Sequence, residues 1–398
     1  MRNYYDYNFD SFETGKVIAA FNKNFAHSSI PESYISHVLD GIDYIKTEII
    51  FYPEDTEQMD NDGEIILIYL KNKNKSAVIN AVEKLSSNPY VLYAEPDYLE
   101  KLLVIPNDPL FKQLWGIQRI NAPLAWNYSR GNSHISVGVI DTGIDHFHPD
   151  IRDNMWFSLN RQFVNGWNFG GNNSNSMDTD GHGTHIAGTI GAIGNNYIGI
   201  TGICWNIRIA SLRFSLDNAS AIAAINFANQ FNINILNASW GSYYYSQALK
   251  SAIDQYKGLF IAAAGNDGMN NDVEPIYPAS YDSNNIISVA AVTQDNILAR
   301  FSNFGARSVD IAAPGTRILS LGLHGEYSNQ NGTSMSAPHV AGAAALLQSY
   351  MPGLSISDTK NIILSSAVRQ QSLVGRILTG GTLDMNAMFV LANRLQQS

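Results

Sequence analysis

The sequence predicts an α/β protein built on a parallel sheet and preceded by a smaller α+β unit. Apolar runs typical of strands buried on both faces alternate with stretches of helical pattern, which favours a parallel sheet covered by helices. The apolar runs are ISVGVI, NINIL, LFIAAAG and NIISVAAV, and the helical stretches include HGTHIAGTIGAI, SAIAAINFANQF and SQALKSAIDQY.

The first hundred residues predict the smaller unit. Between residues 15 and 99, β-rich runs and helical patterns follow the order β-α-β-β-α-β of a ferredoxin-like unit. The segments are KVIAAFN, PESYISHVLDG, YIKTEIIFY, GEIILIYLKN, SAVINAVEKLSS and YVLYAEPDYL. Pro106 and Pro109 then interrupt regular structure. We therefore expect one domain at residues 1–103 and a larger one at 104–398.

The composition restricts the class of protein. The chain has 398 residues, 45% of them hydrophobic, and a formal net charge of -10. This charge predicts no broad cationic surface for nucleic acid or anionic lipid, and it is compatible with cation binding. No stretch reaches the roughly 18 apolar residues of a membrane helix. Cys204 is the single cysteine, so no intramolecular disulfide forms, and its apolar neighbours indicate a buried thiol.

Asp141 and His182 are the first candidates for chemistry. Asp141 follows the run VGVI and is expected at the carboxyl end of a buried strand, where α/β sheets place catalytic groups. His182 stands between two glycines at the start of a small-residue helix. Each residue has an alternative interpretation. An Asp after a strand is commonly a turn or cap residue, and His182 with His185 offers two zinc ligands, although no HExxH motif is present.

Ser334 lies in NGTSMSAPHV, directly before a run, AGAAALLQSY, that favours a helix. Such a serine is either a helix N-cap or a nucleophile presented at a helix start. With Asp141 and His182 it completes the residue types of a nucleophilic triad. An α/β-hydrolase esterase would need Gly-x-Ser-x-Gly around the serine and the order Ser, Asp, His, and the chain has neither.

The segments VIDTGID, HGTHIAGT and GTSMSAPHVAG resemble the three signature motifs of the subtilisin-like serine peptidase family, in that family's order. The resemblance covers the chain from about residue 104 to about residue 390, and the first unit is similar to the family's inhibitory prodomain. It implies a three-layer subtilisin-like fold and a serine endopeptidase made as a self-processing zymogen. The alternative is a pseudoenzyme that keeps the fold to bind or regulate a partner.

The resemblance assigns roles that suit the residue types. His182 would take the proton of Ser334 and return it to the leaving amine, and Asp141 would hold the imidazole in one tautomer. Asn266 in FIAAAGNDG stands where the family has its oxyanion asparagine, with the Ser334 backbone N–H as the second donor. A turn asparagine is the alternative interpretation of Asn266.

The resemblance also implies where a polypeptide substrate binds. Two segments would form the walls of the pocket for the substrate residue before the scissile bond and would pair with an extended peptide. The side chain of that substrate residue is expected to be large and apolar. The wall residues are Ser239, Trp240, Gly241, Ala263, Ala264 and Gly265. Trp240 is alternatively core filling. Tyr277 and Pro278 resemble the family's Tyr-Pro turn, often cis. The family usually carries a Gly-containing loop and an edge strand that bind more distant substrate residues, but the segment near residues 215–220 is short here. This predicts weaker or altered recognition upstream of the cleavage site.

A calcium site follows from the same resemblance, because GAIGNNYIGITG is similar to the family's calcium loop. Calcium prefers six to eight oxygen ligands. Those implied here are the carboxylates of Asp108 and Asp150, the side chain of Asn196 and the carbonyls of Ile193, Ile198 and Ile200. We expect calcium to stabilise the peptidase domain and expect no cofactor in catalysis. An ion-free turn is the alternative.

The remaining expectations concern maturation and partners. The tail YAEPDYLEKLL aligns with the family segment that occupies the active site, which predicts self-cleavage near Leu103 and Val104. The implied partners are polypeptide substrates and the chain's own prodomain as an intramolecular inhibitor, in a monomeric enzyme. The resemblance implies an extracellular location, although no signal segment is visible at Met1.

Overall fold

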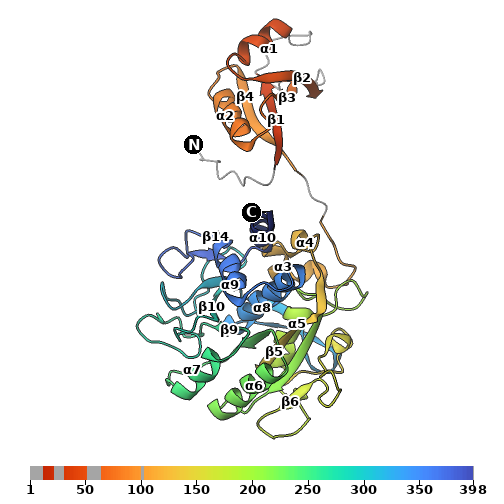
Figure 1. The fold of residues 1–398 in the computed structure, drawn as a ribbon, viewed down its shortest axis with the longest axis vertical. Coiled ribbons are helices and arrows are strands. Elements are labelled where there is room, and N and C mark those ends of the chain that lie inside the picture. The colour runs from red at the N-terminus through yellow and green to blue at the C-terminus, as the bar shows by residue number, and fades with distance from the viewer. Residues whose placement is uncertain (1–11, 22–30, 52–63, 100–102, 398) are drawn as a thin grey trace. The chain divides into compact units, whose positions relative to one another are not determined.

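The computed structural model describes residues 12–21, 31–51, 64–99 and 103–397 and divides into two compact units, Met1–Leu102 and Leu103–Ser398. Along the chain, the division between the units falls after Leu102, one residue before the boundary expected from the sequence. Figure 1 shows the small unit in red and orange and the large unit in yellow to blue.

The small unit has the order of elements expected from its sequence. Its elements are β1 (Phe12–Phe21), α1 (Glu32–Val38), β2 (Tyr44–Phe51), β3 (Ile65–Leu70), α2 (Lys75–Ser86) and β4 (Val91–Tyr98). The strands form an antiparallel sheet in the order β2-β3-β1-β4. Alternate residues of β1 and β3, such as Val17 and Ile66, are buried in one core with Val78 and Val82 of α2, because successive strand residues point to opposite faces.

The large unit is a parallel sheet covered by helices, as the sequence predicts. Its sheet has the order β14-β15-β11-β10-β9-β8-β5-β7-β6, and every neighbouring pair is parallel except β14 and β15. The strands of this sheet are β5 (Gly131–Asp141), β6 (Gly166–Asn168), β7 (Asn206–Arg213), β8 (Ile235–Ala238), β9 (Leu259–Ala263), β10 (Ile286–Val292), β11 (Ile311–Pro314), β14 (Val368–Arg369) and β15 (Gly381–Thr382). A separate hairpin joins β12 (Ile318–Leu321) to β13 (Tyr327–Gln330).

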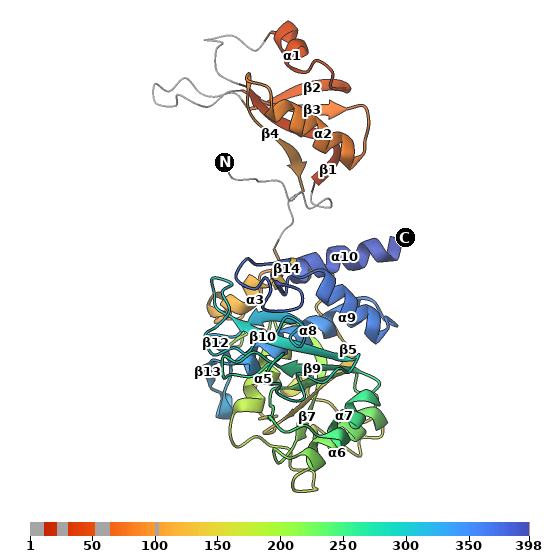
Figure 2. The ribbon, with the colours of Figure 1, turned by 90° about the vertical axis from the view of Figure 1, so that its left-hand side faces the viewer.

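The helices lie on both faces of this sheet (Figures 1 and 2). The α-helices of the unit are α3 (Trp115–Arg119), α4 (Ala122–Ala125), α5 (His182–Gly191), α6 (Asn218–Gln230), α7 (Gln247–Asp254), α8 (Thr333–Tyr350), α9 (Ile356–Ser365) and α10 (Met385–Gln397). Val139 of β5 belongs to the core that contains α5 and α8, whereas the next residue, Ile140, belongs to the core that contains α6 and α7. The three-layer fold expected from the resemblance is confirmed.

Helix α8 is the central helix of its layer. Every residue from Thr333 to Gln348 is buried, and small residues let the helix approach its neighbours closely. A Cβ on Gly342 would lie only 2.9 Å from Cβ of Ile203. A helix that is apolar or small on all sides is typical of a protein core. The buried helix gives the residues at its start, Thr333 and Ser334, a fixed position.

Candidate active site

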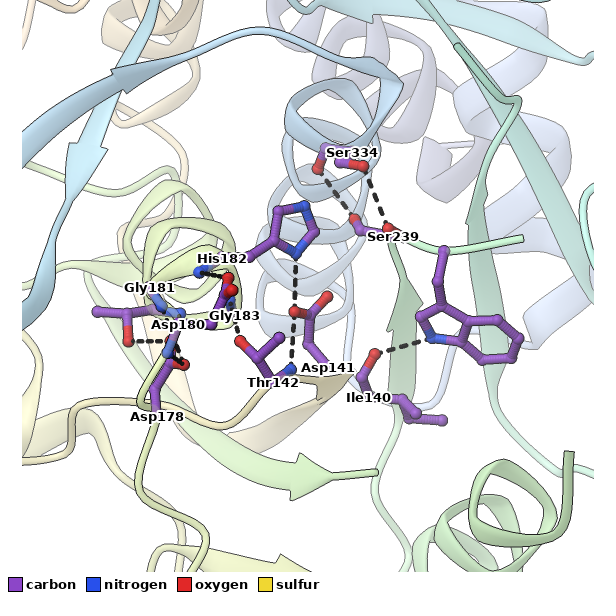
Figure 3. Close-up of polar contacts among 12 residues, drawn as sticks. Ile140, Asp141, Thr142, Asp178, Asp180, Gly181, His182, Gly183, Ser239 and Ser334 are labelled. Atoms are coloured by element: carbon purple, nitrogen blue, oxygen red, sulfur yellow. Dashed lines mark hydrogen bonds and ion pairs between the residues drawn. The ribbon is translucent and has the colours of Figure 1, made fainter. Parts of the chain in front are cut away.

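The structure places Asp141, His182 and Ser334 at ends of regular elements. Asp141 is the last residue of β5, His182 is the first residue of α5, and Ser334 is the second residue of α8. In Figure 3 the imidazole of His182 lies between the carboxylate of Asp141 and the side chain of Ser334. Three segments far apart in the sequence therefore bring their polar groups to one region at the carboxyl end of the sheet.

His182 and Asp141 form a hydrogen-bonded pair in which Asp141 is buried and His182 is partly exposed. Nδ1 of His182 lies 2.8 Å from Oδ1 of Asp141, and the Thr142 N–H donates to the same oxygen at 2.8 Å. Because an ionised carboxylate only accepts, Nδ1 carries a proton and Nε2 of the neutral ring is left as the acceptor. Burial lowers the pKa of His182, but the hydrogen bond and the charge of Asp141, with the charges of Asp180 and Asp178, outweigh it and raise the pKa.

Asp178 fixes the start of α5 and was not singled out from the sequence. Its Oδ1 accepts from the N–H groups of Asp180 and Gly181 at 2.9 and 3.0 Å, and its Oδ2 accepts from the N–H and hydroxyl of Thr184 at 3.0 and 2.7 Å. Burial raises the pKa of Asp178, but these bonds outweigh it and lower the pKa. An Asp just before a predicted helix is a start signal that could have identified it.

Ser334 is not the cap of its helix. The N-cap position of α8 is Gly332, and no side chain caps the helix. The Ser334 hydroxyl instead donates to the carbonyl of Ser239 at 3.1 Å, and the Ser239 hydroxyl donates to the carbonyl of Ser334 at 2.9 Å (Figure 3). The N-cap interpretation is therefore wrong. Gly332 has φ 150°, a backbone conformation that favours glycine.

Thr333, the residue directly before Ser334, holds the side chain of Asn266 in place. The N–H and hydroxyl of Thr333 lie 2.8 and 3.0 Å from Oδ1 of Asn266. Because an N–H can only donate, the atom facing Thr333 is the carboxamide oxygen, and the NH₂ group points elsewhere. The Ser334 N–H belongs to the first turn, whose N–H groups have no partner within the helix. Both donors lie near Gly332: a Cβ there would be 3.6 Å from each nitrogen.

The two candidate substrate segments follow adjacent parallel strands. Ser239, Trp240 and Gly241 follow β8, and Ala263 ends β9, so the segments start side by side. The indole N–H of Trp240 donates to the Ile140 carbonyl at 2.9 Å, and the indole ring packs on the ring of Phe214 with 4.9 Å between the ring centroids. The Trp240 side chain is partly buried and packs against the core that contains α6 and α7, while its backbone and that of Gly241 have no hydrogen-bond partner among the described residues.

The second segment is bonded to the protein instead. The Ala264 N–H donates to Val289, and its carbonyl accepts from Asn271 at 2.8 Å. The Gly265 N–H donates to the Thr333 hydroxyl at 3.1 Å. Ala264 and Gly265 can therefore form a wall, but the free backbone groups for pairing with a peptide lie on Trp240 and Gly241. The peptide bond Tyr277–Pro278 is cis.

The link from β7 to α6 is short. Only residues 214–217 separate the strand from the helix, and Asp217 caps the helix by accepting from the Ser220 N–H at 2.9 Å. Leu216 is 74% exposed and has φ 58°. No strand forms in this described link. The segment therefore lacks the edge strand that the resemblance implies for the family.

The expected calcium ligands come together around residues 193–200. The carboxylate of Asp150 accepts from the Asn196 amide and the Ile200 N–H, both at 2.9 Å, and the carboxylate of Asp108 accepts from the Asn195 N–H at 2.7 Å. Burial, with the nearby charge of Asp108, raises the pKa of Asp150 to about 6. Burial also raises the pKa of Asp108.

The carbonyls expected as ligands are available. Those of Ile193, Ile198 and Ile200 accept no hydrogen bond from any described residue, although Gly199 between them accepts from Leu110 at 2.8 Å. Two buried carboxylates that repel one another beside unpaired carbonyls form a donor set that suits a hard cation such as calcium. The residues therefore fit the ion.

His185 does not share a site with His182. Its Nε2 lies 2.9 Å from the carbonyl of Ile318 and 3.1 Å from that of Ser328, so it carries a proton and donates. Burial lowers the pKa of His185 to about 4. Across the described ranges no group of three His, Cys, Asp or Glu side chains is arranged to hold a metal. Cys204 is buried, and burial raises the pKa of its thiol to about 12.

Comparisons with known proteins show the family to which the chain belongs. A sequence model of the subtilase family matches residues 132–384. Over 310 residues the chain is 39% identical to a thermophilic serine proteinase of Bacillus sp. (strain AK1), covering 76% of this chain and 71% of that protein. It is 37% identical over 272 residues to thermitase of Thermoactinomyces vulgaris, covering 66% of this chain and 91% of thermitase.

A solved structure among proteases from Pseudoalteromonas arctica PAMC 21717 superposes with a TM-score of 0.64 at 25% identity, covering 73% of this chain and 100% of that one. Fold and site thus define a serine peptide hydrolase. The chain belongs to the subtilase family, and it is a subtilisin-like serine endopeptidase that acts on polypeptides. Within the part of the chain that the structure describes, no helix is both long and apolar enough to cross a membrane.

Proposed function

We propose that the endopeptidase cuts through an Asp141, His182 and Ser334 triad and an acyl-enzyme. The supporting observation is the 2.8 Å hydrogen bond from His182 Nδ1 to Asp141, at the edge where Ser334 lies. In the proposed reaction the Ser334 hydroxyl turns from the Ser239 carbonyl towards Nε2 of His182. The oxygen then bonds to the peptide carbonyl carbon while its proton passes to His182. Catalytic hydrogen bonds are often longer or misaligned before substrate binds.

The two halves of the reaction use the same groups. The negative charge on the carbonyl oxygen is stabilised by the Asn266 NH₂ and the Ser334 N–H. As the carbon–nitrogen bond breaks, His182 returns the proton to the leaving amine. Water then enters, gives a proton to His182 and attacks the acyl carbon, and Ser334 recovers its hydrogen. Throughout, Asp141 stabilises the protonated imidazole and stays ionised.

The substrate is an extended peptide that pairs with the free backbone groups of Trp240 and Gly241, by strand addition. Ala263, Ala264 and Gly265 act as the opposite wall. We also propose that the enzyme is a monomer. Light scattering of the Ser334→Ala chain tests this and should give the mass of one chain per particle. A dimer would contradict it.

The small unit is proposed to be an inhibitory prodomain that is removed by self-cleavage. Its sheet and two helices resemble such units, and Leu103, just after it, is 55% exposed. Residues 100–102 of the proposed inhibitory tail lie outside the described residues, while Val104 is anchored by its N–H to the Pro123 carbonyl at 3.2 Å. Cleavage near Leu103 and Val104 would leave that anchor on the mature chain.

Mass spectrometry of the amino termini of purified wild type and Ser334→Ala tests both the triad and the self-cleavage. Wild type is expected to begin near Val104, whereas Ser334→Ala stays at full length. If Ser334→Ala loses its first hundred or so residues in pure form, the processing is not autocatalytic. Casein cleavage by the matured wild type, and none by Ser334→Ala, separates a failure of maturation from a failure of the triad.

Calcium is proposed as a structural ion. When bound, it supplies positive charge that offsets the repulsion between buried carboxylates. Asp108, Asp150 and Asn196 would hold it with the carbonyls of Ile193, Ile198 and Ile200. The support is their convergence and the burial of the two carboxylates, which raises the pKa of Asp150 to about 6.

A further inference from the structure

A second cavity lies at the amino end of the strands of the large sheet, whereas the proposed triad lies at their carboxyl end. Its volume is about 680 Å³, within the range of small-molecule sites in proteins. It lies between the start of β5, the end of α6 and the hairpin of residues 157–164. Ser133 lines the cavity, and roughly 25 Å of strand β5 separates it from Asp141. The cavity is therefore distinct from the candidate active site.

The hairpin gives the cavity a fixed and partly apolar wall. The Ser158 N–H donates to the Phe163 carbonyl at 2.9 Å, and the Phe163 N–H donates to the Ser158 hydroxyl at 3.0 Å, which closes the hairpin. Leu159 near its tip lines the cavity and is fully exposed. The rings of Phe157 and Phe231 line the same cavity. These side chains offer a ligand apolar surface that is already in position.

Several hydrogen-bond donors of the cavity lining have no partner. Trp156 is only 6% exposed, yet its indole N–H donates to no described residue. Nη1 of Arg208 donates to the Asp153 carbonyl at 2.5 Å, whereas Nε and Nη2 bond to no described residue. The side chains of His134 and Asn232 also line the cavity without such a bond. Because an unpaired buried donor costs free energy, a ligand that brings an acceptor would be stabilised here.

The cavity also carries local positive charge on a chain whose net charge is -10. The guanidinium groups of Arg208 and Arg161 lie over the ring of Phe157, 5.0 and 4.4 Å from its centroid. Within the described ranges neither arginine forms an ion pair. The carboxylate of Asp153 is paired with Arg152 at 3.8 Å instead. Unpaired charges and donors favour an anionic ligand, and the aromatic rings favour one with an apolar body.

We infer that this cavity binds the carboxyl terminus of a peptide that ends in an aromatic or large apolar residue. The terminal carboxylate accepts hydrogen bonds from Arg208 and the Trp156 N–H, and the last side chain packs on Phe157 and Leu159. A peptidase releases such a terminus with every cut, because one product ends in the residue that preceded the scissile bond. The inference rests on the proposed function for this source of ligand, whereas the binding itself does not need the triad.

The test is isothermal titration of the full-length Ser334→Ala chain with N-acetyl-phenylalanine and with its amide. Both probes carry the aromatic side chain, and only the first carries a carboxylate. We expect the acid to bind about tenfold more tightly than the amide, as for a hydrogen bond between charged groups. Arg208→Gln should remove this advantage. Arg161→Gln, at an exposed arginine, should reduce it about threefold.

The controls distinguish this site from the catalytic one. Arg369→Gln, at an exposed arginine of β14 on the other edge of the sheet, should bind both probes like the parent chain. Equal affinity for acid and amide, or an advantage of the acid that survives both Arg208→Gln and Arg161→Gln, overturns the inference. Tighter binding of octanoate than of N-acetyl-phenylalanine overturns the assignment to a peptide. If the acid binds as expected but wild type cleaves no casein, the proposed function fails and the binding site stands.

Discussion

Gly265 and Asn303 are in direct contact and together hold the loop that carries Asn266. The Asn303 N–H donates to the Gly265 carbonyl at 2.9 Å, and a Cβ on Gly265 would lie 2.5 Å from Nδ2 of Asn303. Gly265 has φ 110°, where other residues are strained. Asn303 is fully buried and also accepts from the N–H groups of Asp267 and Met269. The backbone on both sides of Asn266 is thus bonded to Asn303.

Replacing Asn266 by Ala should lower kcat by about 10² to 10³, the loss known for the corresponding asparagine of subtilisin, with little change in KM. The Asn266 NH₂ acts on charge that forms only in the transition state. Steady-state kinetics on one peptide measure both constants. Because Asn266 is exposed, the melting temperature should not move. A rise in KM at unchanged kcat would contradict a role in the oxyanion site.

The acid limb of the pH profile should lie above the usual pKa of histidine. Catalysis needs the neutral ring of His182, and the net raised pKa keeps that ring protonated to higher pH, so kcat/KM falls as pH drops through it. Asp180→Asn removes one contributing charge and should move the limb down by a few tenths of a pH unit. The control Asp295→Asn, an exposed carboxylate outside that set, should not. A limb that Asp180→Asn does not move would show that this charge does not reach the ring.

Calcium should stabilise the chain most at neutral pH. Burial raises the pKa of Asp150 in the folded chain to about 6 from an ordinary value of 3.8, so between these pH values the folded state binds the extra proton. Without calcium, the free energy of unfolding should therefore fall as pH rises through this window, by up to about 3 kcal/mol. Calcium binds the ionised form and reverses the loss.

Thermal unfolding of Ser334→Ala in chelator and in calcium measures this effect without self-digestion. Adding Asp150→Asn should flatten the pH dependence in chelator and abolish the response to calcium, while Asp153→Asn, which is exposed, should change neither. An unchanged melting temperature in excess chelator would refute the calcium site.

Recognition far upstream of the scissile bond should be weak, because residues 214–217 form only a short link between β7 and α6. Peptides with two and with four residues before the scissile bond should be cleaved with similar kcat/KM. A strong gain with length would show that another surface replaces the missing edge strand.

The sequence predicted the positions that depend on local pattern. Asp141 follows a recognisable buried strand and His182 starts a recognisable helix, so their places in the fold could be inferred. The orientation of Asn266 could not, because it depends on Thr333, which is 67 residues away in the chain. Asp178 was missed although its position before a helix is a local signal.

Ser334 is a residue whose local sequence pattern predicts a role that the structure does not show. A serine before a strong helical run predicts a cap, but the helix begins one residue earlier and the hydroxyl bonds to Ser239. The contact with Ser239 forms because β8 ends beside the start of α8, and no pattern near Ser334 encodes that. The motif resemblance predicts a nucleophile at this position, whereas the cap preference predicts a role that the structure does not show.

The most direct measurement is the site at which a fluorophosphonate, which labels activated serines, attaches to the matured enzyme. Peptide mass spectrometry should find a single adduct on Ser334 in the matured wild type, because this hydroxyl is the one proposed to be activated by His182. An adduct on another serine, or casein cleavage that survives Ser334→Ala, would contradict the proposed triad.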